Sequence, residues 1–223
     1  MNPLKDRAIA LRKEGQSYNQ ICEKLNLSKS TLCTWLKGVA WSEAIRQQLS
    51  IGAREGARKR MTVISHRARA KRQHLYNEKR GYAQKTFPGF WKESLFSSGL
   101  MIYWGEGDRS IQNGMIRVSN TDPFLLRLFT IFLKKYFKGI FPKIKAYLIL
   151  YPDLHDGQSR RYWSEHIGIP QSRFIKSHYI VGHHPTKRLP YGVCTVMIQS
   201  KAEKQVMHEW LELVRNKAKL MRV

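Results

Sequence analysis

The sequence has few long apolar runs, few acidic residues and little cysteine. No apolar run approaches the roughly 20 residues that a helix needs to span a bilayer. The N-terminus also lacks the apolar region of a signal peptide, so we expect a soluble, cytoplasmic protein without a membrane partner. The three cysteines, Cys22, Cys33 and Cys194, are widely spaced, which fits neither a disulfide framework nor a zinc site. We therefore expect them to be small, at least partly buried thiols.

The shortage of acidic residues leaves a large positive charge, with 40 lysines and arginines against 16 acids and a net charge of +24. A chain of this kind attracts polyanions, of which nucleic acid comes first and an anionic membrane surface second. The charge is uneven along the chain. Residues 1–40 carry seven basic and three acidic residues, residues 41–90 twelve and three, and residues 91–223 twenty-one and ten.

This distribution predicts three parts: a small N-terminal domain over 1–40, a basic helical linker over 41–90 and a mixed C-terminal domain over 91–223. We expect any helix in the linker to end at Pro88-Gly89, because proline and glycine both break helices. There is no internal repeat and no low-complexity tract.

The first part of the sequence predicts three short helices. Gly15 is expected to end the first helix, Ser17 and Ser28 to be the N-caps of the second and third, and Asn26-Leu27 to form the tight turn between those two. Apolar residues recur at helical spacing in each segment. Those expected to face the core are Leu4, Ala8, Leu11, Ile21, Cys22, Leu25, Leu32, Trp35 and Leu36.

A short helix, a tight turn and a capped second helix form a helix-turn-helix. The stretch "SYNQICEKLNLSKSTLCTWL" resembles the helix-turn-helix of resolvase-like and transposase-like DNA-binding domains. The resemblance implies that the outward residues of the third helix meet base edges in the major groove, with the last of them nearer the phosphates. These residues are Lys29, Ser30, Thr31, Thr34 and Lys37. A trihelical protein-interaction module is the alternative, but a polar, basic outer face favours DNA.

The predicted linker is compatible with a helix after Gly56 and carries positive charge all round it. Such a helix repels itself unless a polyanion is near, so we expect it to contact backbone phosphates without reading sequence. The residues expected to do so are Arg58, Lys59, Arg60, Arg67, Arg69, Lys71 and Arg72. A plain solvated helix is the simpler alternative. A membrane-surface helix is disfavoured, because no continuous apolar face opposes the charge.

The C-terminal part predicts an α+β domain of order αββαβ(α)ββα, with helices on one face of a curved antiparallel sheet. Asn113-Gly114 is a typical hairpin turn, and Asp122 with Pro123 is a typical helix start. Helices are expected over 91–103, from 122 onward, over 156–170 and over 201–218. Strands are expected over 109–112, 115–119, 143–151, 173–181 and 191–200.

The stretch Gly99 to Gly107, followed by this order of elements, resembles the LAGLIDADG homing-endonuclease fold. In the resemblance Gly105 takes the small position used for close helix packing, Glu106 takes the metal-binding acid and Gly107 the final turn. Two residues depart from the motif, since Met101 replaces a small residue and glutamate replaces the commoner aspartate. Nearly the whole chain resembles bacterial proteins that join a helix-turn-helix to one such domain.

The resemblance implies a homodimer, because one motif supplies one acid, and it places Gly99, Tyr103 and Gly105 at the dimer interface. It implies Mg²⁺ or another divalent cation on Glu106 and Asp108, with no small-molecule cofactor. The basic residues that it implies on the sheet face are Arg117, Lys143 and Arg173 toward DNA, and Lys145 and Lys176 as candidate catalytic groups.

The function expected from the sequence is sequence-specific binding of double-stranded DNA, with metal-dependent homing-type cleavage. We expect the protein in the cytoplasm of a bacterial or phage-infected cell, associated with the nucleoid. A non-cleaving transcription regulator with a degenerate LAGLIDADG fold is the first alternative. An RNA-binding or RNA-processing factor is the second, and it is less favoured because the A-form major groove is too narrow for a helix-turn-helix.

Overall fold

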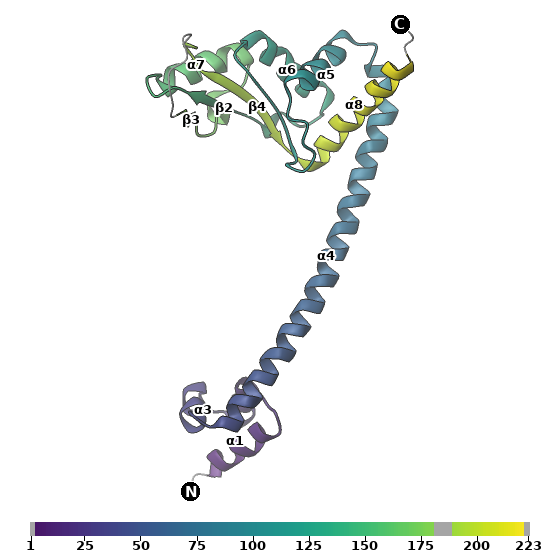
Figure 1. Cartoon of the computed structure of the whole chain (residues 1–223). Coiled ribbons are helices and arrows are strands. Elements are labelled where there is room, and N and C mark those ends of the chain that lie inside the picture. Colours follow the sequence, from purple (N-terminus) through teal and green to yellow (C-terminus); the bar gives the residue numbers. More distant parts are fainter. Residues whose placement is uncertain (1–2, 181–188, 221–223) are drawn as a thin grey trace. The chain divides into compact units, whose positions relative to one another are not determined.

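The computed structural model describes residues 3–180 and 189–220 (Figure 1). The chain divides into two compact units, Met1–Lys71 and Arg72–Val223. Helix α4 (Ala40–Phe90) contributes its first part to one unit and its last part to the other. No helix in the described ranges is long and apolar enough to cross a membrane.

The N-terminal unit begins with the three short helices that the sequence predicts: α1 (Pro3–Lys13), α2 (Tyr18–Leu25) and α3 (Lys29–Leu36). Both predicted N-caps are confirmed. The Ser17 side chain accepts from the backbone N–H of Gln20, whose side chain accepts in turn from the N–H of Ser17 at 2.9 Å, which is a capping box. Ser28 accepts from the N–H of Thr31 at 3.1 Å. Asn26 ends α2 in the left-handed conformation, with φ of 48°.

Apolar side chains at helical spacing form the small core of this unit. Ala8, Ile21, Leu32 and Leu36 are buried, and the other predicted core residues except Leu4 pack partly buried around them. Leu4 is 45% exposed, so its predicted place in the core is wrong. It lies in the first turn of α1, beyond the residues against which the rest of the helix packs.

Arg12 is an unexpected member of the same unit, because its side chain is only 1% exposed. Its guanidinium donates from Nε to Ser42 Oγ at 3.1 Å, from Nη2 to the Ser42 carbonyl at 2.8 Å and from Nη1 to the Gln16 carbonyl at 2.7 Å. These bonds fasten α1 to the first turn of α4. The structure therefore continues the N-terminal unit past residue 40.

Helix α4 is longer than the sequence predicts. It starts at Ala40 rather than after Gly56, and it continues through Pro88 to Phe90. The prediction that Pro88-Gly89 ends the helix is wrong by a short margin. Proline removes one backbone hydrogen bond, but Phe87 and Phe90 on either side pack into the C-terminal core, with the Phe90 ring 6.1 Å from the Trp210 ring.

The last part of α4 is thus an element of the C-terminal unit rather than a linker. Ala83 is fully buried there. Three side-chain contacts join the same stretch to the last helix: Lys79 pairs with Glu203, Arg80 donates to Gln205 and Gln84 donates to Glu209, each at 2.7 Å.

The C-terminal unit is a mixture of helices and a four-stranded sheet, so the coarse α+β class is confirmed. The helices are α5 (Ser94–Glu106), α6 (Pro123–Tyr136), α7 (Asp156–Ile167) and α8 (Lys201–Leu220), with 3-10 turns η1 (Phe141–Lys143) and η2 (Gln171–Arg173). The strands are β1 (Met115–Asn120), β2 (Ile144–Leu150), β3 (His178–Tyr179) and β4 (Val193–Gln199). The strand order is β1-β4-β2-β3, antiparallel except for the β2–β3 pair, which is parallel.

The predicted hairpin at Asn113-Gly114 is wrong, because the structure has no strand over 109–112 and β1 pairs with β4 instead. Between the segment before Asn113 and β1, a single isolated bridge joins Gly107 to Val118. The cause is local: the Asp108 carboxylate accepts from the Ser110 N–H and from the Asn113 side chain, which folds the segment into a loop.

The predicted strand over 173–181 is also largely wrong. It shrinks to the two residues of β3, and Val181 lies outside the described residues. Arg173 falls in η2 and Lys143 in η1, so neither is on a strand. With these changes the helices and strands of the unit follow the order αβαβαββα.

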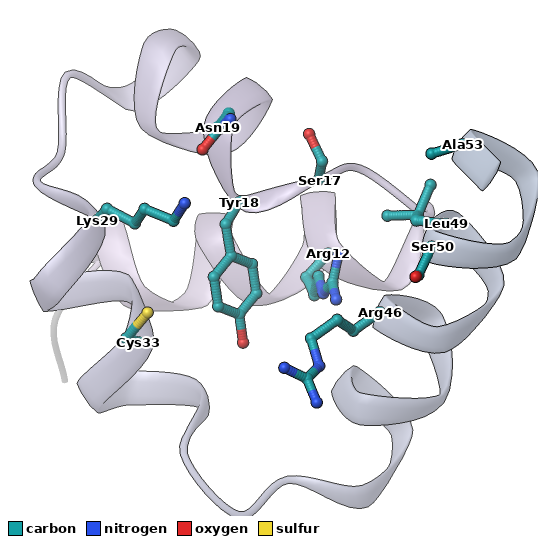
Figure 2. A pocket seen from close by; sticks show the side chains of 10 residues that line it. All are labelled: Arg12, Ser17, Tyr18, Asn19, Lys29, Cys33, Arg46, Leu49, Ser50 and Ala53. Atoms are coloured by element: carbon teal, nitrogen blue, oxygen red, sulfur yellow. The ribbon is translucent and has the colours of Figure 1, made fainter. Parts of the chain in front are cut away.

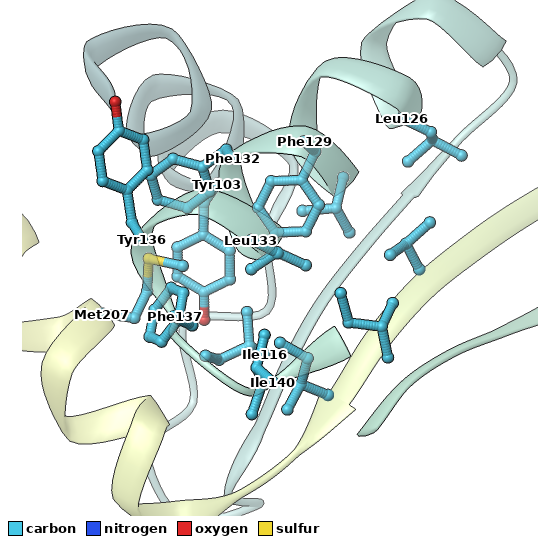
Figure 3. Close-up of a cluster of buried hydrophobic side chains, with 14 of the residues drawn as sticks. Tyr103, Ile116, Leu126, Phe129, Phe132, Leu133, Tyr136, Phe137, Ile140 and Met207 are labelled. Carbon is cyan, nitrogen blue, oxygen red and sulfur yellow. The ribbon is translucent and has the colours of Figure 1, made fainter. Parts of the chain in front are cut away.

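The core lies between the sheet and the helices (Figure 3). Buried side chains alternate along β1 and β2, which directs Ile116 and Val118 toward the helices. Figure 3 shows the aromatic side chains of α6 above the sheet, with Met207 of α8 beside them. Phe96 of α5 lies among five aromatic rings, including Trp210 at 5.0 Å.

Gly99 lets α5 approach α6 closely. A methyl group at this position would overlap the Phe132 side chain close to its attachment to the backbone. We expect Gly99→Ala to lower the free energy of unfolding by about 1–3 kcal/mol, the usual cost of overpacking. Gly105→Ala is the matched control on the same helix, since nothing lies within 4 Å of that site. It should leave stability unchanged or raise it by up to ~1 kcal/mol. Urea unfolding of both variants checks this, and equal effects would refute it.

Candidate nucleic-acid interface

Helix α3 presents one polar stripe to solvent. Leu32 and Leu36 anchor the opposite side of the helix in the core. The exposed residues of the stripe are Lys29, Ser30, Cys33, Thr34 and Lys37. Four of these are predicted DNA contacts, and the structure brings them together on one face, as the helix-turn-helix interpretation expects.

Two residues of α3 differ from what the sequence predicts. Thr31 is only half-exposed, and its hydroxyl lies 2.8 Å from that of Ser28, so it serves the N-cap. Cys33 is exposed in the middle of the stripe, although the sequence analysis treats it as an at least partly buried thiol. Its signal is its spacing, four residues from both Lys29 and Lys37, which puts all three on one face of the helix.

A pocket adjoins this stripe within the N-terminal unit (Figure 2). It is lined from four places: α1, the start of α2, α3 and the first turns of α4. The lining residues are Arg12, Ser17, Tyr18, Asn19, Lys29, Cys33, Arg46, Leu49, Ser50 and Ala53. Three are cationic and none is acidic.

The Arg12 guanidinium donates to no carboxylate in the described residues, although the charge of nearby Glu43 acts on it. All three of its hydrogen bonds go to uncharged oxygen atoms, and the described residues offer it no carboxylate ion pair. Its guanidinium carbon lies 4.6 Å from the centre of the Tyr18 ring. Burial disfavours the charged form and lowers the pKa of Arg12 from its ordinary value. The pocket therefore has a positive potential that an anion would relieve.

The central part of α4 carries its positive charge in solvent. The seven predicted phosphate contacts there are all exposed: Arg58, Lys59, Arg60, Arg67, Arg69, Lys71 and Arg72. Apolar residues are exposed in the same stretch, including Met61 at 65% and Ile64 at 60%. The structure thus leaves the basic side chains accessible to a polyanion.

In the C-terminal unit, one predicted DNA contact, Arg117, and one predicted catalytic group, Lys145, lie on the sheet face that points away from the core. Arg117 of β1 and Lys145 of β2 flank Met197 of β4 in one row across the sheet. The next row is Ser119, Thr195 and Tyr147. None of the strands in the described part of the chain carries an acidic residue.

The other three predicted basic residues do not join this row. Lys143 and Lys176 are exposed but lie outside the strands. Arg173 is engaged within the unit, because Nη1 donates to the Phe141 carbonyl at 2.5 Å and the guanidinium carbon lies 3.9 Å from the centre of the Phe141 ring. Lys145 lies within β2 and Lys176 lies between η2 and β3, so the two candidate catalytic residues belong to different elements.

The two predicted metal ligands have different surroundings. Glu106 is exposed at the last residue of α5. Asp108 forms an ion pair with Arg117 at 2.9 Å and accepts from Ser110 and Asn113. Burial acts to raise the pKa of Asp108, but the Ser110 N–H and the charges of Arg117 and Lys204 outweigh it, so the pKa lies below its ordinary value.

This donor set does not fit a magnesium ion within one copy of the chain. Magnesium needs oxygen ligands that are free to coordinate, and the oxygens of Asp108 are already bound by cationic and neutral donors. Across the residues that the structure describes, no group of three or more histidines, cysteines or acids could hold a metal.

Lys204 of α8 is a buried charged residue that was not predicted from the sequence. It is fully buried, and its ammonium donates to the Tyr103 hydroxyl at 2.5 Å, to the Met115 carbonyl at 2.7 Å and to the Asp108 carbonyl. Burial lowers its pKa to about 8. It anchors the loop that carries Asp108 and leads into β1. Its spacing from Met207 and Leu211 on the buried face of α8 is the signal that could have found it.

The predicted dimer interface needs correction. Gly99 and Tyr103 are fully buried inside the unit, against α6 and around Lys204, so a second copy cannot contact them. Gly105 is exposed, and on the same outer side of α5 lie Ser98 and Met101. These residues recur at helical spacing around the side of α5 that faces away from the core.

Comparison with known proteins identifies one region of the chain. Residues 7–40 match a family model described as a homeodomain-like domain. This match covers α2, α3 and most of α1, and it supports the helix-turn-helix interpretation. No curated protein and no solved structure matches the chain.

The buried ammonium of Lys204 makes stability depend on pH. Its pKa is about 8 in the folded chain and near its ordinary value of 10.5 when unfolded. Its stabilising contribution is therefore greatest above pH 10.5 and is lost as the pH falls through 8. Relative to Lys204→Met, the free energy of unfolding of the unmodified chain should rise between about pH 8 and pH 10.

Urea unfolding of both proteins across this range measures the difference. Burial raises the pKa of the Cys194 thiol and adds its own pH dependence, but Cys194 is present in both proteins, so its contribution cancels. At pH 7 Lys204→Met should unfold more readily by about 1–3 kcal/mol, because it leaves buried oxygens without donors. A difference that does not change with pH would contradict the assignment.

Proposed function

We propose that the chain is a sequence-specific double-stranded DNA-binding protein whose helix α3 enters the major groove. One observation carries the proposal: the exposed side of α3 is a continuous polar and basic stripe, in the segment that matches a homeodomain-like domain. In this geometry the outward side chains of the second helix of the motif reach base edges. Ser30, Cys33 and Thr34 are then the residues that read bases.

Helix α4 supplies affinity in this proposal. Its exposed arginines and lysines contact phosphates, whose charge is the same at every sequence, so they strengthen binding without directing it. On the C-terminal unit, Lys145 offers a further exposed basic group on the outer face of the sheet, while Arg117 in the same row is paired with Asp108. Control of transcription or of a mobile element is the class of process that a non-cleaving protein of this kind serves.

Dimerisation belongs to the proposal as well. A chain with one helix-turn-helix recognises a short site, and two copies on a near-palindromic site double the sequence that is read. The support on the molecule is the outer side of α5. Ser94, Ser98, Met101 and Gly105 are exposed there and uncharged, in a chain whose net charge is +24.

Metal-dependent DNA cleavage in a LAGLIDADG-like domain is the second candidate function. The observation in its favour is that Glu106 is exposed at the end of α5, close in sequence to the loop that pairs with Arg117. A metal there would need ligands beyond Asp108, such as one Glu106 from each of two copies together with phosphate oxygens. The different order of strands and the engaged Asp108 weigh against this candidate.

The division between residues that contact bases and residues that contact phosphates can be tested on DNA selected from a random pool. Ser30→Ala and Thr34→Ala should change which bases are preferred, by about 1–3 kcal/mol at the affected positions. Neutralising Arg67 and Arg69 should weaken binding to all sequences and reduce the salt slope by about one per lost phosphate contact. Thr62→Ala, on α4, is the control. If both sets change preference and salt slope alike, the division is wrong.

The cleavage candidate makes a separate prediction. With Mg²⁺, the unmodified chain should nick or cut its selected duplex, and Glu106→Gln should bind that duplex equally well without cutting it. Asp108→Asn serves as a comparison, because it disturbs the loop but leaves Glu106 in place. Gel analysis of end-labelled duplex with and without Mg²⁺ measures both. No cutting by the unmodified chain, or undiminished cutting by Glu106→Gln, would eliminate this function.

A further inference from the structure

We propose that the pocket between α3 and α4 of the N-terminal unit binds one sugar–phosphate segment of a DNA strand, beside the groove that α3 enters. The inference rests on the proposed function and deepens it. It assigns DNA contact to the start of α4, at Arg46, Leu49 and Ala53, which lies outside the matched residues 7–40.

The shape of the pocket suits a nucleotide-sized group. It has a volume of about 520 Å³ and is open to solvent along one side. Figure 2 shows the Tyr18 ring in the pocket, with Lys29 on one side of it and Arg12 and Arg46 on the other. The walls come from separate helices that the core holds together, so the pocket is formed before any ligand binds.

The charges of the pocket suit a phosphate. Arg12 contributes a buried positive charge whose hydrogen bonds go to uncharged oxygens, and Lys29 adds an exposed ammonium. Arg46 is 70% exposed and pairs with Glu43, which is itself exposed, so this ion pair is weak and can give way to a phosphate. A phosphate oxygen can accept from a guanidinium more strongly than a neutral group can.

The remaining lining suits a deoxyribose. The Tyr18 ring, Leu49, Ala53 and the Cys33 thiol present mainly apolar atoms between the cationic groups. A free inorganic anion would leave this surface uncovered, whereas a sugar attached to the phosphate would cover it. The combination of an apolar floor and a cationic edge therefore favours a strand segment over a lone ion.

The pocket is also in register with the reading helix. Lys29 and Cys33 belong both to the exposed stripe of α3 and to the pocket lining. A strand whose bases face α3 must carry its backbone along one side of that helix. The pocket lies on the side toward α4, so the same strand can place a phosphate in it.

A pair of alanines on α4 tests the pocket directly. Ala53 lines it and Ala57, one turn further on, does not, and both are exposed. Ala53→Phe should fill the pocket and weaken binding of the selected duplex about tenfold or more, which corresponds to the loss of one charged contact. Ala57→Phe should bind within about twofold of the unmodified chain. Circular dichroism and thermal unfolding verify that both variants fold.

A second measurement does not depend on filling the pocket. Duplexes with a single uncharged methylphosphonate at successive positions should reveal one phosphate per half-site whose neutralisation weakens binding of the unmodified chain. Arg46→Met should weaken binding of the normal duplex and lose nothing further at that position.

Equal binding of the duplex by Ala53→Phe and Ala57→Phe would overturn the pocket assignment and leave the proposed function standing. A methylphosphonate effect that persists in full in Arg46→Met would do the same. A pocket that serves a small aromatic carboxylate instead would give the first of these results. If the unmodified chain selects no duplex at all, the proposed function itself fails.

Discussion

Each unit of the chain is held by one buried cation whose hydrogen bonds go to uncharged oxygen atoms. Arg12 joins α1 to the start of α4, and Lys204 joins α8 to the loop before β1. Burying a charge is costly unless its donors are satisfied, so each of these side chains requires its surrounding backbone to keep one arrangement. The positions of the candidate sites follow from them: the pocket beside α3 includes Arg12, and the segment bearing Asp108 and Arg117 is fixed by Lys204.

Charge is divided sharply between these buried groups and the surface. Most of the described lysines and arginines are at least partly exposed, and they include Lys29 and Lys37 at α3 and the basic residues around the middle of α4. The same excess that would repel itself in isolation is neutralised when phosphates approach. In the proposed DNA complex, sequence reading falls to a few uncharged side chains, Ser30, Cys33 and Thr34, because a basic residue that meets a phosphate meets the same group at every site.

The C-terminal unit departs in several places from what the LAGLIDADG resemblance of its sequence implies. The stretch Gly99 to Gly107 does form the end of a helix with a tightly packed glycine, but that glycine packs against Phe132 of the same unit. Tyr103 likewise bonds to Lys204 rather than facing a second copy. Asp108, next to the predicted metal acid, pairs with Arg117 and turns the expected hairpin into a loop. Apart from the exposed Glu106, these residues therefore make their contacts within the C-terminal unit.

The sequence by itself determined the local features of this protein. The N-caps Ser17 and Ser28 and the helix start at Asp122 depend on neighbouring residues only, and each is as predicted. Tertiary structure decided the pairing of β1 with β4, the continuation of α4 through Pro88 and the use of Lys204 and Arg12 as buried donors. These features depend on residues that lie far apart in the chain, whose contacts leave no local pattern. The candidate site follows the same division, because the exposed polar stripe of α3 was visible in its spacing, whereas the pocket beside it exists only once α4 packs against the first three helices.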